Sequence, residues 1–209
     1  MNSAHEKFIF DSSAFYTFIR HYKDQIRAQY EINYFYFDTK DMALIQNNQT
    51  ARIRSISSAD CKNFFEFKLN TDIIKTKNED IITTISAFLK PSDIDTIIID
   101  QAISLTHRVL PQSIIKKVSE TTQEKSIDLV AIYKIMRKYL TLGEITIKAD
   151  ICTYENNNFY EISFDANNME EAKEKMKDLF KSLNVSYSFS TLSKLSRIDV
   201  FMPYLNKLK

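Results

Sequence analysis

Several strand-like segments of this chain alternate apolar side chains with fully charged ones, and the charges have both signs. Within residues 50–57, Arg52 and Arg54 fall on one face of an extended chain, whereas Ala51 and Ile53 fall on the other. The same period of two returns in residues 63–70, 143–155 and 158–166. Their charged faces carry Glu66 with Lys68, Lys148 with Asp150, and Glu161 with Asp165. This pattern predicts strands with one apolar and one charged face.

Two arrangements of such strands fit the pattern. The charged faces can form the solvated side of an open antiparallel sheet. Alternatively, the sheet closes so that the charged faces line an interior, and helices cover the apolar outside. A charged interior needs a ligand, because unpaired buried ions are costly. Arginine side chains bind phosphate oxygens in bidentate fashion, and carboxylates bind cations. A polyphosphate with a divalent metal would therefore suit such an interior.

The chain of 209 residues contains a single glycine, Gly143. Glycine-rich dinucleotide loops, Walker A loops and G-x-S-x-G nucleophile turns are therefore excluded. Any phosphate must be bound by side chains instead. The 28 basic residues nearly balance the 27 acidic ones, so we expect neither a nucleic-acid partner nor a membrane partner. An anion site must be a local concentration of positive charge.

Cysteine usage and hydropathy bear on the location of the protein. Cys61 and Cys152 are the only cysteines, and they lack the spacing of zinc ligands or of a disulfide framework. A reducing cytoplasm is the simplest environment for such a chain. The N-terminus lacks a signal-peptide pattern, and no apolar run reaches the roughly 18 residues of a membrane helix. We therefore expect a soluble, cytoplasmic protein.

The N-terminal part of the chain predicts a helix followed by a strand. Residues 14–30 place apolar side chains at helical spacing after the capping residues 11–13. Residues 31–40 are rich in aromatic and β-branched side chains, which indicates a strand.

The rest of the chain predicts a helical insertion within one sheet. Residues from about 75 to 125 carry helix caps and helical spacing, and we expect helices there, between two halves of the sheet. Residues 126–140 fit either a strand or a helix. Residues 167–185 are the clearest helix. Because no linker or repeat interrupts the sequence, residues 1–209 are predicted to form a single domain.

Four sequence blocks in a fixed order carry a resemblance to a known family. Residues 33–54, NYFYFDTKDMALIQNNQTARIR, combine an aromatic-Asp-Thr block with Arg-x-Arg. FEFKLN at 65–70 supplies the next lysine, residues 137–185 combine a basic pair, acidic strands and a helix, and TLSKLSR at 191–197 closes the series. In this order the blocks resemble the CYTH superfamily, the triphosphate tunnel metalloenzymes. The resemblance covers the chain apart from about residues 75–125.

The resemblance implies both a fold and a class of ligand. The family has an eight-stranded antiparallel tunnel, so we expect an α+β fold with a closed antiparallel β-barrel, a charged interior and helices packed outside. Its members act on triphosphates with Mg²⁺ or Mn²⁺, and they include inorganic triphosphatases, thiamine triphosphatases and class IV adenylate cyclases. The helical insertion is expected either to cover a tunnel mouth or to mediate dimerisation, and both a monomer and a homodimer are compatible with the sequence.

By the same resemblance, phosphate binding falls to seven basic residues: Arg52, Arg54, Lys68, Arg137, Lys138, Lys194 and Arg197. Arg52 and Arg54 would bind phosphate in bidentate fashion, and Lys68 would add a point charge that also serves catalysis. For Lys138 and Arg197, an ordinary surface position is the simpler interpretation.

Metal binding falls, by the resemblance, to four carboxylates: Glu161, Asp150, Asp165 and Glu66. Asp150 and Glu161 match the family's carboxylates directly. Ser163 stands where a second glutamate is usual, and Asp165 is the next inward position, about 6.6 Å along a strand. Glu66 fits equally well as the ion-pair partner of Lys68 or of an arginine.

The opening residues depart from the family pattern. The family begins with Glu-x-Glu-x-Lys, whose glutamates help hold the metal and whose lysine positions water. If Lys7 is that lysine, Ser3 and His5 replace both glutamates, and Glu6 lies on the other strand face. His5 would suit Mn²⁺ or Zn²⁺ better than Mg²⁺, although a lone histidine near a terminus is more often just exposed. The departure weakens the case for metal-dependent turnover but not for anion binding.

Three functions follow from these assignments. The first is metal-dependent hydrolysis of inorganic triphosphate or a small triphosphate ester, with Lys7 orienting the attacking water. The second is a polyphosphate- or nucleotide-binding domain that has lost turnover. The third is a class IV-like adenylate cyclase, for which no residue marks a base pocket or an activated ribose hydroxyl. In each case the expected partner is a small triphosphate-like anion.

Overall fold

The computed structural model describes residues 7–58, 61–75, 80–105, 110–190, 198–199 and 203. The chain divides into two compact units. Unit 1 comprises Met1–Glu31 and Lys134–Leu192, and unit 2 comprises Ile32–Tyr133 and Ser193–Lys209. Strands β2 (Ile26–Asp38) and β7 (Ser126–Leu142) each contribute residues to both units.

The strands belong to one mainly antiparallel sheet, which helices accompany, so the predicted α+β class is confirmed. The strand order is β10-β1-β9-β8-β7-β2-β3-β4-β5, and β6 pairs with β7. The predicted closure into a barrel is not observed, because β10 and β5 end this order and no pairing among the described residues joins them. Alternating side chains determine which face of a strand is apolar, but they do not encode pairing between the end strands.

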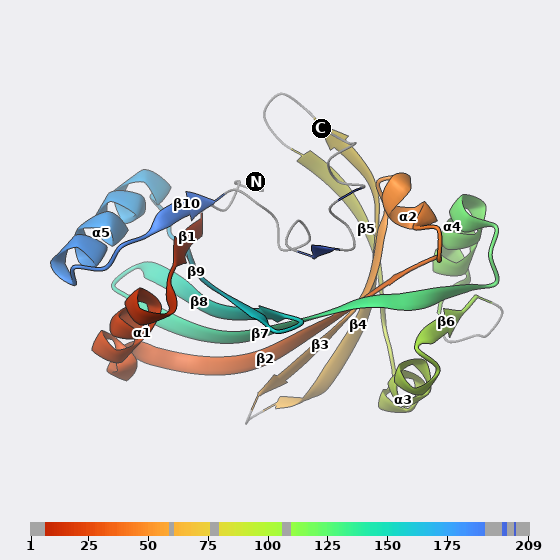
Figure 1. Ribbon diagram of the computed structural model, residues 1–209, viewed down its shortest axis with the longest axis horizontal. Coiled ribbons are helices and arrows are strands. Elements are labelled where there is room, and N and C mark those ends of the chain that lie inside the picture. The colour runs from red at the N-terminus through yellow and green to blue at the C-terminus, as the bar shows by residue number, and fades with distance from the viewer. Residues whose placement is uncertain are drawn as a thin grey trace. The chain divides into compact units, whose positions relative to one another are not determined.

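Unit 1 packs two helices against the apolar faces of its strands (Figure 1). Its elements are β1 (Lys7–Phe10), α1 (Ser12–His21), the 3₁₀ helix η1 (Lys23–Gln25), β8 (Ile145–Tyr154), β9 (Asn157–Asp165), α5 (Met169–Ser182) and β10 (Ser188–Ser190). The Asp11 side chain caps α1 by accepting a 2.8 Å hydrogen bond from the Ala14 amide. The core contains Phe8, Phe18, Ile147, Ile162, Met176 and Phe180.

Helix α1 is shorter than the sequence predicts. It ends at His21, and after η1 the chain enters β2 at Ile26, so the expected helix over residues 14–30 is wrong beyond its first part. Residues 26–30 alternate between half-buried and exposed side chains in the strand. Pairing within the sheet therefore outweighs the helical spacing of the apolar residues here.

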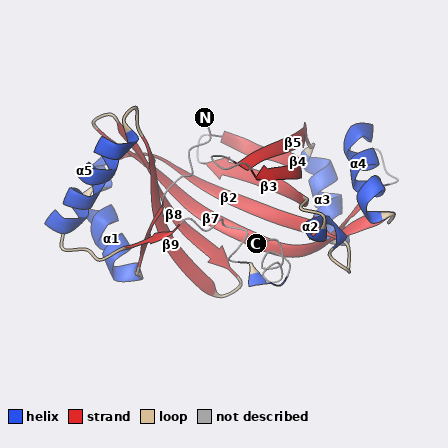
Figure 2. Ribbon diagram, turned by 90° about the horizontal axis from the view of Figure 1, so that it is seen from above, coloured by secondary structure: helices blue, strands red, loops and turns tan. Residues whose placement is uncertain are grey.

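Unit 2 places three helices against the apolar face of β3 and β4, and both ribbon views show these helices together (Figure 2). Its elements, besides its parts of β2 and β7, are α2 (Ala43–Gln46), β3 (Thr50–Ser58), β4 (Cys61–Lys75), β5 (Asp80–Phe88), α3 (Pro91–Asp100), β6 (Ala102–Ser104) and α4 (Gln112–Thr122). The core contains Leu44, Ile53, Phe67, Leu69, Ile94, Ile97, Ile114 and Val118.

The buried Asp38 side chain fixes the start of α2. Its carboxylate accepts hydrogen bonds from the amides of Thr39 at 2.8 Å, Leu44 at 2.9 Å and Ile45 at 3.0 Å. Burial raises the pKa of Asp38, and these hydrogen bonds oppose that shift without cancelling it. The carboxylate thus takes up amides that a four-residue helix cannot satisfy by itself.

The region from about 75 to 125 is not wholly helical, which corrects the prediction for this segment. Helices α3 and α4 are present, but residues 80–88 and 102–104 are the strands β5 and β6. The β5 sequence, DIITTISAF, is rich in β-branched residues, which favour a strand. Residues 126–140, which fit either element, belong to strand β7. Among the described residues, none of the helices has the length and apolar character needed to span a membrane.

Candidate functional site

The charged face of unit 2 lies on β3 and β4. Arg52 is directly opposite Lys68, and Arg54 is directly opposite Glu66. Arg54 Nη2 lies 2.6 Å from Glu66 Oε2, and Lys68 Nζ lies 3.4 Å from the same oxygen. The other face of these strands, including Ile53, is buried in the core. We call Arg52, Arg54, Glu66 and Lys68 the cationic cluster.

The cationic cluster contains buried donors that are not satisfied. In the part of the chain that the structure describes, Nε of Arg52 and Nε of Arg54 are buried and have no hydrogen-bond partner. The Arg52 guanidinium lies over the ring of Tyr34, with Cζ 5.2 Å from the ring centroid. Buried donors without acceptors are rare and costly in folded proteins. Both arginines therefore retain a buried donor that an external acceptor can satisfy.

The charges within the cationic cluster do not balance. Arg52, Arg54 and Lys68 are positive, and Glu66 is the one carboxylate among the four, which leaves an excess of two positive charges. Glu66 is 8% exposed and pairs with Arg54 and Lys68. This pairing favours its role as an ion-pair partner over its predicted role as a metal ligand. The cluster is therefore suited to an anion with more than one negative charge.

Unit 1 contains a second, acidic group. Asp150 and Glu161 are directly opposite each other on β8 and β9, and each is 1% exposed. Cys152 lies two residues beyond Asp150 on the same face and is buried. One potential ligand atom from each of these three residues lies within 4.8 Å of the other two. We call Asp150, Cys152 and Glu161 the acidic cluster.

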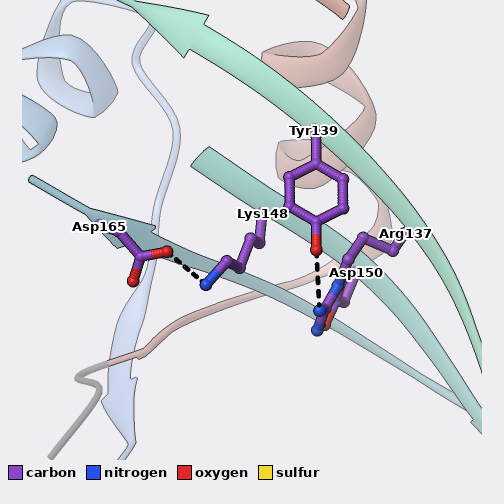
Figure 3. Close-up of polar contacts among 5 residues, drawn as sticks. All are labelled: Arg137, Tyr139, Lys148, Asp150 and Asp165. Carbon is purple, nitrogen blue, oxygen red and sulfur yellow. Dashed lines mark hydrogen bonds and ion pairs between the residues drawn. The ribbon is translucent and has the colours of Figure 1, made fainter. Parts of the chain in front are cut away.

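Arg137 forms an ion pair with Asp150, one member of the acidic cluster, and Figure 3 draws these two residues with Tyr139. Its Nε and Nη2 donate to the two carboxylate oxygens of Asp150 at 2.7 Å each, and its Nη1 donates to the Tyr139 hydroxyl at 3.4 Å. Burial by itself lowers the pKa of Arg137, but the hydrogen bonds and charge of Asp150 outweigh it and raise that pKa. Arg137, predicted to bind phosphate, therefore has most of its donors engaged by protein groups.

Asp165 has a cationic partner in the structure. It is predicted as a displaced metal ligand, and it forms an ion pair with Lys148 on the neighbouring strand (Figure 3). Ser163 lies between Asp165 and Glu161 on this face and is directly opposite Lys148. The metal role of Asp165 stays a prediction.

Lys7 and Lys138 occupy different faces of unit 1. Ile9 is directly opposite Glu161, so Lys7, two residues earlier in β1, shares a face with that carboxylate. Lys138 alternates with Arg137 along β7 and lies on the other face, away from Asp150. Ser3, His5, Lys194 and Arg197 lie outside the described residues.

Cys152 and Tyr34 are contributors that the sequence analysis does not single out. The available signal for Cys152 is the spacing Asp-x-Cys in an alternating strand, which places both side chains on one face. Their approach to Glu161 depends on the register between β8 and β9, which the sequence does not state. The signal for Tyr34 is weaker, since many tyrosines alternate in β2.

Comparisons with known proteins agree with the fold. The sequence matches the CYTH domain family over residues 19–197. A solved Hippeastrum protein, named as a candidate adenylyl cyclase with a dominant triphosphatase activity, is similar with a TM-score of 0.68 and 13% identity, over 95% of this chain and 94% of that one. A candidate adenylate cyclase from Bacillus halodurans gives a TM-score of 0.59 and 17% identity, over 92% and 95% of the two chains. At these identities the likeness concerns the fold alone. No curated protein matches the sequence.

Proposed function

The chain belongs to the CYTH domain family, and from that premise we propose that it binds a triphosphate-like anion and hydrolyses its terminal phosphate in a metal-dependent reaction. The supporting observation is the pair of buried, unsatisfied Nε donors of Arg52 and Arg54 beside Lys68. A polyphosphate supplies both the acceptor oxygens and the negative charge that this cluster lacks. The substrate is inorganic triphosphate or a small triphosphate ester.

In this proposal the basic residues recognise the anion. The two arginines each present a planar fork to phosphate oxygens, and the Arg52 guanidinium packs over the Tyr34 ring. Lys68 adds a point charge that offsets negative charge as the terminal phosphate leaves. Lys194 and Arg197 continue the basic lining, as the family resemblance implies.

The acidic cluster suits a divalent cation, because it brings two carboxylates and a thiol within reach of one another away from solvent. In the proposal, Glu161 and Asp150 hold Mg²⁺ or Mn²⁺, with Asp165 as an outer carboxylate. A cation bound there would add positive charge and polarise a phosphoryl oxygen. Lys7, on the face of Glu161, orients the attacking water.

A binding domain without turnover is the second candidate. Both oxygens of Asp150 already accept hydrogen bonds from Arg137, and Ser163 stands where the family has a glutamate. These observations favour weakened metal chemistry with an intact cationic cluster. A class IV-like adenylate cyclase is the third candidate, and among the described residues no group marks a ribose-activating base.

One set of measurements separates these candidates. Purified protein is incubated with tripolyphosphate, thiamine triphosphate or ATP, each with Mg²⁺, Mn²⁺ or chelator, and phosphate, pyrophosphate and cyclic AMP are quantified beside the heat of binding. A hydrolase releases phosphate only with metal, and a cyclase releases pyrophosphate with cyclic AMP. A binding domain without turnover shows a heat of binding but forms none of these products. Absence of binding to every triphosphate would refute the assignment.

Two sets of variants sharpen the assay. Lys68→Ala is expected to weaken anion binding about ten-fold or more, whereas Arg27→Ala, an exposed arginine in β2, should leave it unchanged. Ser3→Glu with His5→Glu is expected to raise the metal-dependent rate if the altered opening limits turnover. If the double change leaves the rate unaltered, another part of the chain limits metal-dependent turnover.

A further inference from the structure

Tyr34 on β2 contacts the cationic cluster from the neighbouring strand. Phe35 and Phe37, which alternate with Tyr34, pack in the core of unit 2, so Tyr34 lies on the opposite, charged face. Strand β2 is next to β3 in the sheet, and Cζ of Arg52 lies 5.2 Å from the centroid of the Tyr34 ring. A guanidinium within about 6 Å of a ring centroid is attracted by the negative face of the ring. Tyr34 and Arg52, which both belong to unit 2, therefore form a cation–π pair.

A second tyrosine packs against the Tyr34 ring. The ring centroids of Tyr34 and Tyr36 lie 6.2 Å apart, and the two ring planes are inclined by 30°. Aromatic pairs at such separations stabilise each other. Tyr36 is 2% exposed, whereas Tyr34 is half-buried. The Tyr34 ring therefore connects a buried ring to the Arg52 guanidinium.

Arg52 differs from the other two arginines of the charged faces in the groups that hold it. Arg54 forms a 2.6 Å ion pair with Glu66. Two donors of Arg137 are engaged by Asp150, at 2.7 Å each. For Arg52, the described part of the chain supplies no ion pair, and its buried Nε has no hydrogen-bond partner there. The ring of Tyr34 is therefore the contact that restrains the Arg52 guanidinium.

An aromatic ring restrains a guanidinium without using its hydrogen-bond donors. The attraction acts through the face of the ring, whereas a carboxylate engages the N–H groups that a phosphate would need. An arginine side chain also loses rotamer freedom when it binds a ligand, and a contact that already restricts the side chain reduces this cost. Arg52 thus combines a restricted position with donors that an anion can engage.

We propose that Tyr34 is a positioning residue, whose ring holds the Arg52 guanidinium where it receives the anion. The inference rests on the proposed function and adds to it the residue that prepares Arg52 for binding. Because Tyr34 acts through Arg52, its contribution to affinity disappears when Arg52 is absent. The ring carries this role, and the hydroxyl is not required for it.

The first test removes the ring or only its hydroxyl. Dissociation constants for tripolyphosphate are measured by calorimetry in chelator. Tyr34→Leu is expected to weaken binding about three- to ten-fold, whereas Tyr34→Phe should bind as the unchanged protein does because it keeps the ring. Tyr16→Leu, which removes an exposed tyrosine of α1, is the matched control and should leave the constant unchanged.

A double-mutant cycle separates positioning from a structural role. In the Arg52→Ala background, Tyr34→Leu should cause no further loss of affinity. In the Arg54→Ala background it should cause its full three- to ten-fold loss, because Arg52 is still present. A tyrosine that only stabilises the sheet would weaken binding equally in both backgrounds.

A spectroscopic test serves if Tyr34→Leu does not fold. The chain contains no tryptophan, so Tyr34→Trp introduces a single fluorophore beside Arg52. Tryptophan is the strongest aromatic partner of a cation, so this variant should bind tripolyphosphate at least as tightly as the unchanged protein. Its emission should shift on saturation with tripolyphosphate, whereas that of Tyr16→Trp should not. Weaker binding by Tyr34→Trp without an emission shift would overturn the inference.

The outcomes also distinguish this inference from the function on which it rests. If the unchanged protein does not bind tripolyphosphate, the proposed function is wrong and the inference falls with it. If it binds and Tyr34→Leu has the same effect in both arginine backgrounds, or no effect in the unchanged protein, anion recognition stands and the positioning role is wrong. If Tyr34→Phe weakens binding as much as Tyr34→Leu does, the hydroxyl rather than the ring matters, which also overturns the inference.

Discussion

Arg137 and Asp150 form a bidentate ion pair, in which Nε and Nη2 each lie 2.7 Å from one carboxylate oxygen. The Asp150 side chain is 1% exposed and that of Arg137 is 18% exposed. The pair therefore belongs to the interior of unit 1, where a charge without its partner is costly. Its first role is to permit a carboxylate to lie beside Cys152 and Glu161.

Arg137→Ala is expected to lower the free energy of unfolding by about 3–5 kcal/mol, because it leaves the Asp150 carboxylate buried without its cation. Arg137→Lys should give a smaller loss, since it keeps the charge but not the two parallel hydrogen bonds. Urea denaturation measures both. Lys148→Ala is the matched control, because the Lys148–Asp165 pair is more exposed and should contribute at most about 1 kcal/mol. Equal losses for the Arg137 and Lys148 variants would contradict the buried role.

The strands that carry the clusters are the part of the fold most accessible from sequence. The alternation around Arg52, Glu66, Asp150 and Glu161 predicts both the strands and their charged faces, and the structure confirms them. The physical reason is that a strand has a period of two and one face of it must meet a core. No comparable rule exists for the register that brings Cys152 toward Glu161.

Other features depend on interactions that a local pattern does not contain. Helix α1 ends at His21, and after a 3₁₀ turn the residues from Ile26 onward pair in the sheet, although their spacing is helical. The bidentate hold of Arg137 on Asp150 joins β7 to β8 and requires knowledge of their alignment. Which strands lie at the ends of the sheet, and therefore whether the sheet closes, also depends on contacts between residues far apart in the sequence.

Arg52→Ala is expected to separate anion affinity from stability. Within the described residues Arg52 has an aromatic contact with Tyr34 but no ion pair, so its removal should change the free energy of unfolding by less than about 1 kcal/mol. Tripolyphosphate affinity should fall by roughly ten-fold or more, because charge-assisted hydrogen bonds are lost. Calorimetry and urea denaturation on the same preparation check both halves. A variant that loses stability yet keeps affinity would assign Arg52 a structural role instead.

Arg54→Ala should affect both properties at once. It removes a phosphate-binding group and also the 2.6 Å partner of Glu66, which is 8% exposed. We expect a loss of affinity similar to that of Arg52→Ala, together with a drop in the free energy of unfolding of about 1–3 kcal/mol. Adding Glu66→Gln to Arg54→Ala should recover part of that stability, because the buried negative charge is then absent. No recovery would show that the Glu66 charge is satisfied by Lys68 alone.

The free energy of unfolding is expected to depend on pH through Asp38, and Asp38→Asn should remove this dependence. Burial raises the folded-state pKa of Asp38 above its unfolded value of about 3.9, so the folded protein binds this proton more tightly. The resulting stabilisation is complete below about pH 3.9 and is lost as pH rises through the folded pKa. The free energy of unfolding of the unchanged protein minus that of Asp38→Asn should therefore fall over this interval. A difference that rises with pH would mean that the hydrogen bonds from the α2 amides outweigh burial.

Glu161→Gln tests the acidic cluster as a metal site without relying on catalysis. A neutral amide is a poorer ligand than a carboxylate, so Mn²⁺ binding, followed by calorimetry, should weaken at least ten-fold. The thiol of Cys152 suits Mn²⁺ better than the harder Mg²⁺, so the unchanged protein should bind Mn²⁺ more tightly, and Cys152→Ala should narrow that difference. In chelator, Glu161→Gln should bind tripolyphosphate as the unchanged protein does, because the cationic cluster is untouched. Glu144→Gln, an exposed carboxylate beside β8, is the control. If Glu161→Gln binds Mn²⁺ as tightly as the unchanged protein does, the acidic cluster is not the metal site. The binding domain without turnover is then the function that remains.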